Sequence, residues 1–206
     1  MQNLFQYSTY TEKITKKEKR ILFVGLLHPI KGLDYLFEAL SKLKKTRDDF
    51  QLDVVGYGPY ENKYRQLVEK LNLINKVKFY GMKTKNDVAN FMQNCDFLVF
   101  PSLVIPNIWE GWGIVLIEAI ACGKPVITTT SNCKPGDFIV TDYGVLVPPK
   151  DSEALLKAIK YMLDNFNKYP TEDMIKYVRK NFSYKAVGRL LHRIYVQVLR
   201  DYKRVK

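Results

Sequence analysis

Residues 21–40 read ILFVGLLHPIKGLDYLFEAL, and this stretch indicates the fold. It begins with four consecutive apolar residues that stop at Gly25, which is typical of a strand buried on both faces of a sheet. Apolar residues then recur at spacings of three and four between Leu33 and Leu43, the pattern of an amphipathic helix. A buried strand followed by such a helix is the first half of a βαβ unit.

The same alternation of strand and helix continues along the chain. We expect five further strands, at residues 52–55, 77–80, 97–100, 125–128 and 145–147. Helical patterns lie between most of them and after the last. The sequence therefore predicts an α/β fold, a single Rossmann-like doubly wound parallel sheet of about six strands with flanking helices. We expect this domain at 19–182, after a basic and polar segment at 1–18. A basic amphipathic helix at 183–206 would pack on or beyond the domain.

Composition narrows the class of protein. The chain has 206 residues, of which 47% are hydrophobic and 26% charged, the balance of a soluble globular domain. It has no apolar run of about 18 residues, and its first ten residues do not resemble a secretory signal. Three cysteines are too few for a disulfide framework. These features predict a cytoplasmic protein.

The net charge of +12 is concentrated near the two ends of the chain. Residues 183–206 carry seven Lys or Arg against Asp201 alone, and residues 11–20 carry five against two Glu. The nearly balanced middle argues against a nucleic-acid groove across the domain. The basic ends are either solvated faces or contacts with an acidic partner or with the anionic inner face of a membrane, where the protein would be peripheral.

Glycines follow the predicted strands at the edge where ligands bind in such sheets. They are Gly25, Gly56, Gly58, Gly81, Gly111 and Gly113. Each alone is an ordinary turn residue, but the set at successive strand ends favours a ligand that approaches the backbone closely. Other chemistries lack their residues: no complete GxGxxG fingerprint, phosphate-loop lysine, Gly-x-Ser-x-Gly elbow or Cys/His metal spacing occurs.

Two carboxylates flank the start of the helix expected at 113–121. Most residues of this helix are apolar, so we expect it to be buried and Glu118 to need a partner. If the eight residues from Glu110 to Glu118 were all helical, the two would lie ~12 Å apart along the axis. They therefore suit the two ends of an extended ligand, or else one is a loop carboxylate and the other caps neighbouring backbone.

The segment PSLVIPNIWEGWGIVLIEAIACGKPVITT, residues 101–129, resembles the Glu-x7-Glu motif of family 4 retaining glycosyltransferases and of similar group 1 enzymes. Five more stretches resemble this family in the same order: the opening 21–40, LDVVGYGPYENKYRQL, VKFYGM, CDFLVFPS and YGVLVPPKDSEALLKAI. The resemblance covers about residues 19–202. It implies the C-terminal, nucleotide-sugar-binding half of a GT-B fold.

The resemblance implies a role for each matching residue. Glu110 and Lys31 would be the catalytic residues, Glu110 at the hydroxyls of the transferred sugar and Lys31 at the departing diphosphate. Glu118 would accept hydrogen bonds from the ribose. The remaining substrate-binding positions would be Gly25, Gly58, Gly81, Met82, Gly111, Trp112, Gly113, Ile114 and Val115. The implied donor is a UDP-, GDP- or ADP-sugar, and no metal ion or other cofactor is implied.

Two departures from the family pattern leave the function open. Leu26 stands where the family usually has an Arg that faces the diphosphate, although His28 could supply a donor nearby. Residues 1–19 are also too short for the acceptor-binding half. The chain is therefore expected to be the donor domain of an enzyme that transfers a hexose to a glycan, lipid or protein. The alternative is a non-catalytic nucleotide-sugar-binding or interaction module that needs a separate acceptor-binding domain or subunit.

Overall fold

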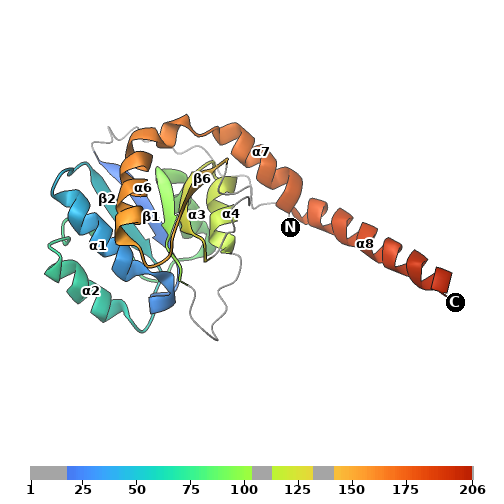
Figure 1. The fold of residues 1–206 in the computed structure, drawn as a ribbon, viewed down its shortest axis with the longest axis horizontal. Helices are drawn as coiled ribbons and strands as arrows, with labels where there is room; N and C mark the ends of the chain where they lie inside the picture. The colour runs from blue at the N-terminus through green and yellow to red at the C-terminus, as the bar shows by residue number, and fades with distance from the viewer. Residues whose placement is uncertain (1–17, 104–112, 132–141, 206) are drawn as a thin grey trace.

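The computed structural model describes residues 18–103, 113–131 and 142–205. These residues contain a six-stranded, all-parallel sheet with the strand order β3-β2-β1-β4-β5-β6 (Figure 1). The strands are β1 (Lys19–Val24), β2 (Phe50–Val55), β3 (Val77–Phe79), β4 (Phe97–Phe100), β5 (Val126–Thr129) and β6 (Gly144–Val147). All six predicted strands are confirmed, and so is the doubly wound α/β fold.

The helices cover both faces of the sheet, as βαβ crossovers require. One face is covered by α1 (Leu33–Lys44), α2 (Glu61–Lys70) and α6 (Ser152–Asn165), and the other by α3 (Lys85–Asn94) and α4 (Ile114–Ala121) (Figure 1). Beyond α6 come the 3₁₀ turn η2 (Phe166–Lys168) and helix α7 (Thr171–Phe182), which packs on α4. The central strands read as unbroken apolar runs because both of their faces are covered: Ile21, Leu22 and Phe23 are all 0% exposed.

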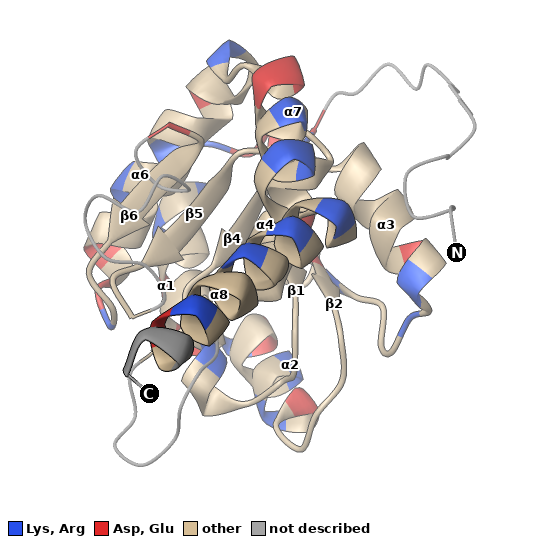
Figure 2. Ribbon diagram, turned by 90° about the vertical axis from the view of Figure 1, so that its right-hand side faces the viewer, with Lys and Arg blue, Asp and Glu red and all other residues tan. Residues whose placement is uncertain are grey.

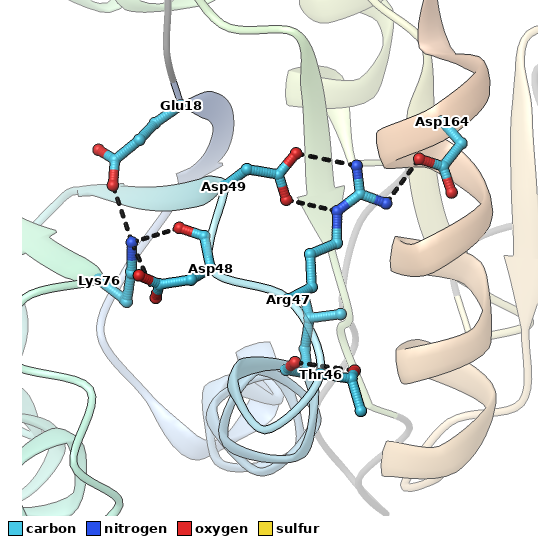
Figure 3. Close-up of polar contacts among 8 residues, drawn as sticks. Glu18, Thr46, Arg47, Asp48, Asp49, Lys76 and Asp164 are labelled. Atoms are coloured by element: carbon cyan, nitrogen blue, oxygen red, sulfur yellow. Dashed lines mark hydrogen bonds and ion pairs between the residues drawn. The ribbon is translucent and has the colours of Figure 1, made fainter.

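Ion pairs link the connecting loops at the amino edge of the sheet, opposite the carboxyl ends of the strands (Figure 3). Arg47 donates to both carboxylate oxygens of Asp49 and to Asp164 on α6. Nearby, the ammonium group of Lys76 contacts Glu18 and Asp48 at 2.8 and 3.1 Å. Lys76 is 5% exposed, so its charge is stabilised by these carboxylates and hardly by water. These contacts tie the α1–β2 connection to α6 and to the start of β1.

The last helix, α8 (Tyr184–Val205), projects from the body of the protein and packs mainly against α7 (Figure 1). Its large apolar side chains are exposed, from Tyr184 at 86% to Leu199 at 61%. Lys and Arg recur along it with hardly an acidic residue between them (Figure 2). The helix therefore lies beyond the sheet and not upon it. In the part of the chain that the structure describes, no helix has both the length and the apolar character needed to cross a bilayer.

Candidate functional site

The candidate site lies at the carboxyl ends of β1 and β4, where the strand order reverses. From β1 the sheet continues through β2 on one side and through β4 on the other, and the helices that follow β1 and β4 lie on opposite faces. The loops that leave the two strands therefore diverge, and ligands of open α/β sheets bind at such a point. The sequence prediction that ligand-binding residues gather at this edge is consistent with the observed topology.

Backbone hydrogen bonds join the loops at this edge in series. The N–H of Gly25 donates to Val55, and the N–H of Gly56 donates to Gly81, each over 3.0 Å. A Cβ on Gly56, which has φ of +143°, would lie 1.9 Å from the Gly25 oxygen. A Cβ on Gly58 would lie 2.4 Å from the Leu27 oxygen. Glycine is required here because neighbouring loops approach one another, while the expected contacts of Gly25 and Gly58 with a ligand stay predictions.

Lys31 is fixed at the point where the strand order reverses. It ends the short 3₁₀ turn η1 (Pro29–Lys31), and its ammonium nitrogen lies 4.9 Å from the centre of the Phe100 ring at the end of β4. The turn is held against the chain after β4, because the Leu103 N–H donates to the Ile30 oxygen over 2.7 Å. The next residue, Gly32, has φ of +67°, and a Cβ there would lie 2.1 Å from the Pro101 oxygen. The position of Lys31 is therefore set by backbone packing.

The N-terminus of α4 meets the same aromatic ring. Gly113 is the N-cap residue of α4, with φ of +59°, and a Cβ built on it would lie 3.3 Å from Cε1 of Phe100. Phe100 also stacks on Phe23 of β1, with ring centroids 6.4 Å apart. The structure thus brings Lys31 and Gly113 to one ring. A lysine ammonium beside a helix N-terminus is a combination suited to an anion such as a diphosphate.

Glu118 lies one turn further along α4, on the same side of the helix as Ile114. Both are exposed, Ile114 to 70%, whereas Leu116, Ala119 and Ile120 are buried. The prediction that the whole helix is buried is therefore wrong for this side, because the sheet covers only one face of α4. Desolvation by the surrounding chain still raises the pKa of the Glu118 carboxyl, and the charge of Lys85 at the start of α3 acts in the opposite direction.

Among the described residues, four large apolar side chains around this edge are exposed, and Ile114 is one of them. The others come from the loops after β1, β2 and β3: Leu26 is 45% exposed, Tyr57 56% and Met82 72%. Gly81, which has φ of +68°, precedes Met82, and a Cβ there would meet no atom within 4 Å. The Gly81–Met82 edge is therefore open, and its expected contact with the nucleotide base stays a prediction.

Glu110, Gly111 and Trp112 lie outside the described residues, so their expected contacts with the sugar stay predictions. The described part of α4 begins at Ile114, after an N-cap glycine in a left-handed conformation. The spacing calculated for a continuous helix from Glu110 to Glu118 therefore does not apply, because Gly113 interrupts it.

Sequence reasoning missed Phe100, which the structure places beside Lys31, and Lys85, whose charge acts on the Glu118 carboxyl. Neither carries a sequence signal, since an apolar strand residue and a lysine at a helix start are both common. His28 also has a definite role: its Nδ1 accepts from the Ile30 N–H over 3.3 Å and caps η1. Among the described residues, no three His, Cys, Asp or Glu side chains are arranged to hold a metal ion.

Comparisons with known proteins agree with the family resemblance of the sequence. The family model described as "Glycosyl transferases group 1" matches residues 10–181. An uncharacterized glycosyltransferase of Methanocaldococcus jannaschii is 36% identical over 136 residues, which cover 66% of this chain and 35% of the relative. A GDP-mannose-dependent phosphatidylinositol monomannoside mannosyltransferase of Corynebacterium glutamicum is 34% identical, with 68% and 36% covered.

The fold is also that of solved glycosyltransferases. Sucrose-phosphate synthase from Thermosynechococcus elongatus superimposes with a TM-score of 0.74 at 28% identity, covering 90% of this chain and 47% of that one. The first curated relatives are longer, since the chain spans only 35% to 45% of their length. The sequence motifs, the topology and the family match agree, and the chain belongs to the group 1 glycosyltransferases, with the Rossmann-like fold of the C-terminal GT-B domain.

Proposed function

We propose that this chain is the donor-binding domain of a retaining glycosyltransferase that transfers a hexose from a nucleotide-diphosphate sugar. The observation that carries the proposal is the meeting of the Lys31 ammonium group and the α4 N-terminus on the ring of Phe100. Together they supply a full positive charge and the positive end of a helix dipole at one place. A diphosphate is the part of a sugar nucleotide that such a place would stabilise.

In this proposal the ribose and the base lie on one side of the diphosphate, and the sugar lies on the other. The ribose hydroxyls would donate hydrogen bonds to the Glu118 carboxylate, whose pKa is raised by desolvation. The base would lie along Gly81 and Met82, whose edge is open. The sugar would extend in the other direction, toward Glu110. This order is supported by Lys85, which begins the helix after β3 and whose charge acts on Glu118.

In the proposed reaction, an acceptor hydroxyl oxygen attacks the anomeric carbon on the same face from which the diphosphate leaves. The bond between that carbon and the diphosphate oxygen breaks, and the proton of the hydroxyl passes to the departing diphosphate. Lys31 and the backbone N–H groups at the α4 N-terminus stabilise the charge that develops on the leaving group. No metal ion takes part in this proposal. Same-face attack retains the anomeric configuration.

The acceptor would be held by a part of the protein other than this domain. The chain spans less than half of its first curated relatives, and exposed apolar side chains surround its site. A second domain or subunit that covers these side chains would complete the reaction centre. The C. glutamicum relative is named for a phosphatidylinositol mannoside, so a lipid-linked glycan is one acceptor class to test. A cytoplasmic location and contact with an anionic membrane stay predictions.

Saturation-transfer NMR tests the proposal directly. UDP-, GDP- and ADP-hexoses are added singly to the protein, with and without Mg²⁺, and then displaced by the matching nucleoside diphosphate. We expect one of the three donors to show saturable transfer to both ribose and hexose protons in the absence of metal. A protein that gives no transfer from any donor would contradict the proposal.

A second function is favoured by one residue. Leu26 offers no charge to a diphosphate where the family usually places Arg, which fits a module that binds sugar nucleotides without transferring the sugar. Assays of this chain together with an acceptor-binding domain or subunit, a donor and a lipid-linked acceptor separate the two. Product with retained configuration supports the enzyme, whereas donor binding without product supports the module.

A further inference from the structure

A buried carboxylate lies on β2, the strand next to β3, which leads to the edge proposed to hold the base. Asp53 of β2 is 1% exposed. Its Oδ2 accepts from Arg20 of β1, with Nε at 2.9 Å and Nη2 also in contact. Its Oδ1 accepts from Gln51 over 2.7 Å and from the Tyr80 hydroxyl over 3.1 Å. The negative charge of Asp53 is therefore balanced by Arg20, and both of its carboxylate oxygens accept hydrogen bonds.

Tyr80 connects this carboxylate to the loop after β3. Its N–H donates to the Val54 oxygen over 2.9 Å, and its ring packs edge-on against Phe91 of α3, with centroids 4.6 Å apart. The following residue is Gly81, whose oxygen accepts from Gly56 over 3.0 Å. Tyr80 is thus held by its backbone, its ring and its hydroxyl immediately before the exposed Met82.

The other end of this short connection is fixed as well. Thr84 is the N-cap of α3 and forms a capping box with Asp87, each side chain bonding to the other's backbone N–H. Only residues 81–83 lie between the two anchors. A three-residue connection pinned at both ends has few conformations, so a small change at either anchor changes where it lies.

We propose that Tyr80 is a positioning residue for the donor pocket, and that its hydrogen bond to buried Asp53 holds the Gly81–Met82 edge in place for the nucleotide base. This inference rests on the proposed function. It assigns Tyr80 an effect on the nucleoside part of the donor and none on the diphosphate, which is bound by Lys31 and α4. The effect on affinity comes from ordering the edge before the ligand arrives.

Removing the Tyr80 hydroxyl is a mild change to the fold. In Tyr80→Phe the Asp53 carboxylate keeps Arg20 and Gln51, and the ring of residue 80 keeps its contact with Phe91. Tyr64→Phe is the control, because the Tyr64 hydroxyl is buried but has no hydrogen-bond partner in the structure. Each variant loses one hydroxyl oxygen, but only Tyr80→Phe loses a hydrogen bond to Asp53.

The test measures affinity for UDP, GDP, ADP and inorganic pyrophosphate by calorimetry in the wild type and both variants. We expect Tyr80→Phe to weaken binding of the nucleoside diphosphate by about three- to tenfold, less than the loss of a direct contact, because the hydrogen bond acts on the ligand only by ordering the edge. Its affinity for pyrophosphate should be unchanged, and Tyr64→Phe should match the wild type for both ligands. Without any ligand, amide hydrogen exchange at 81–83 should become faster in Tyr80→Phe only.

Each other outcome has a definite meaning. If Tyr80→Phe binds the nucleoside diphosphate as tightly as the wild type, or loses pyrophosphate equally, or leaves exchange at 81–83 unchanged, the positioning role is wrong and the proposed function stands. If the wild type itself binds none of the nucleoside diphosphates, the proposed function fails, and this inference fails with it.

Discussion

The ammonium nitrogen of Lys31 lies 4.9 Å from the centre of the Phe100 ring, on which the α4 N-terminus also rests through Gly113. The contact joins the loop after β1 to the end of β4 at the point where the strand order reverses. A cation held by an aromatic face keeps its charge available to an anionic ligand. This relationship links the fold to the proposed chemistry.

Replacing the Lys31 charge should weaken diphosphate binding without unfolding the domain. Lys31→Met keeps an unbranched side chain over Phe100 but removes the ammonium group. We expect affinity for nucleoside diphosphates to fall by roughly 10- to 100-fold, the range for one lost charge-assisted contact. Lys42→Met, which removes an exposed lysine paired with Glu153, is the control and should bind like the wild type. Equal losses in the two variants, measured by calorimetry, would rule out a specific role for Lys31.

Binding should weaken as the pH falls, because the Glu118 carboxylate must accept hydrogen bonds from the ribose. Since its pKa is raised, protonation begins at a higher pH than for an ordinary glutamate. Affinity titrations between pH 4 and 8 should show a decline that is absent in Glu118→Gln, which binds weakly throughout. Lys85→Met removes a charge that lowers this pKa and should move the decline to higher pH. A profile identical in Glu118→Gln and the wild type would contradict the assignment.

A side chain at Gly113 should disturb the start of α4. Gly113→Ala places a Cβ at a φ of +59°, which costs about 1–2 kcal/mol, and brings it within 3.3 Å of Phe100. We expect a lower free energy of unfolding and a loss of nucleotide affinity. In Gly188→Ala, on exposed α8, the Cβ meets no atom within 4 Å. This control should bind normally. Because alanine favours a helix more than glycine does, its free energy of unfolding should not fall below that of the wild type. Normal binding by Gly113→Ala would show that the α4 N-terminus does not contact the ligand.

Restoring the family's arginine should strengthen the anion site. Leu26 is 45% exposed in the loop after β1, so Leu26→Arg adds a guanidinium group with little effect on the core. We expect roughly tenfold tighter binding of the nucleoside diphosphate by calorimetry, the effect of one bidentate contact. Tyr57→Arg adds the same charge in the neighbouring loop and serves as the control. If both variants gain affinity equally, the gain is a general effect of charge and position 26 has no special role.

The charge cluster at the amino edge should contribute to stability in a pH-dependent way. The Arg47 guanidinium lowers the pKa of the Asp49 carboxyl, and Asp49 is partly exposed, so the pair contributes about 0.5–1 kcal/mol (Figure 3). A depressed pKa gives stability that is present above the unfolded value of about 4 and is lost as the pH falls below it. Urea unfolding of Arg47→Met should therefore show a deficit at pH 7 that shrinks toward pH 2. Arg65→Met, which breaks the surface pair with Glu61, should show a smaller deficit. An Arg47→Met deficit of the same size at pH 7 and pH 2 would contradict this account.

Much of the fold could be predicted because strands covered on both faces appear as unbroken apolar runs, as in residues 21–24. The place of the glycines at the carboxyl ends of the strands could be predicted from where those runs stop. The strand order could not be predicted, since apolar runs carry no information about which neighbour they pair with. The exposed side of α4 was missed for a related reason: Ile114 and Leu116 are equally apolar, and only the packing of α4 against β4 and α7 distinguishes them.

Candidate site residues could be proposed from the sequence where a residue type has a chemical role. Residues that only hold such a side chain in place could not. Lys31 and Glu118 were proposed from the family resemblance, whereas the ring beside Lys31 was not, because Phe100 looks like any core residue. Asp53 does leave a trace, since a lone carboxylate inside the run LDVV implies a buried partner. That its partners include Arg20 and Tyr80 depends on the pairing of β1, β2 and β3, which the sequence does not state.

Calorimetric titration of the purified chain with UDP, GDP and ADP, without metal, tests the central claim most directly. We predict saturable one-to-one binding of one nucleoside diphosphate, reduced strongly in Lys31→Met and in Glu118→Gln. The absence of binding to all three, by a chain whose folding is verified by circular dichroism, would contradict the donor site at the α4 N-terminus.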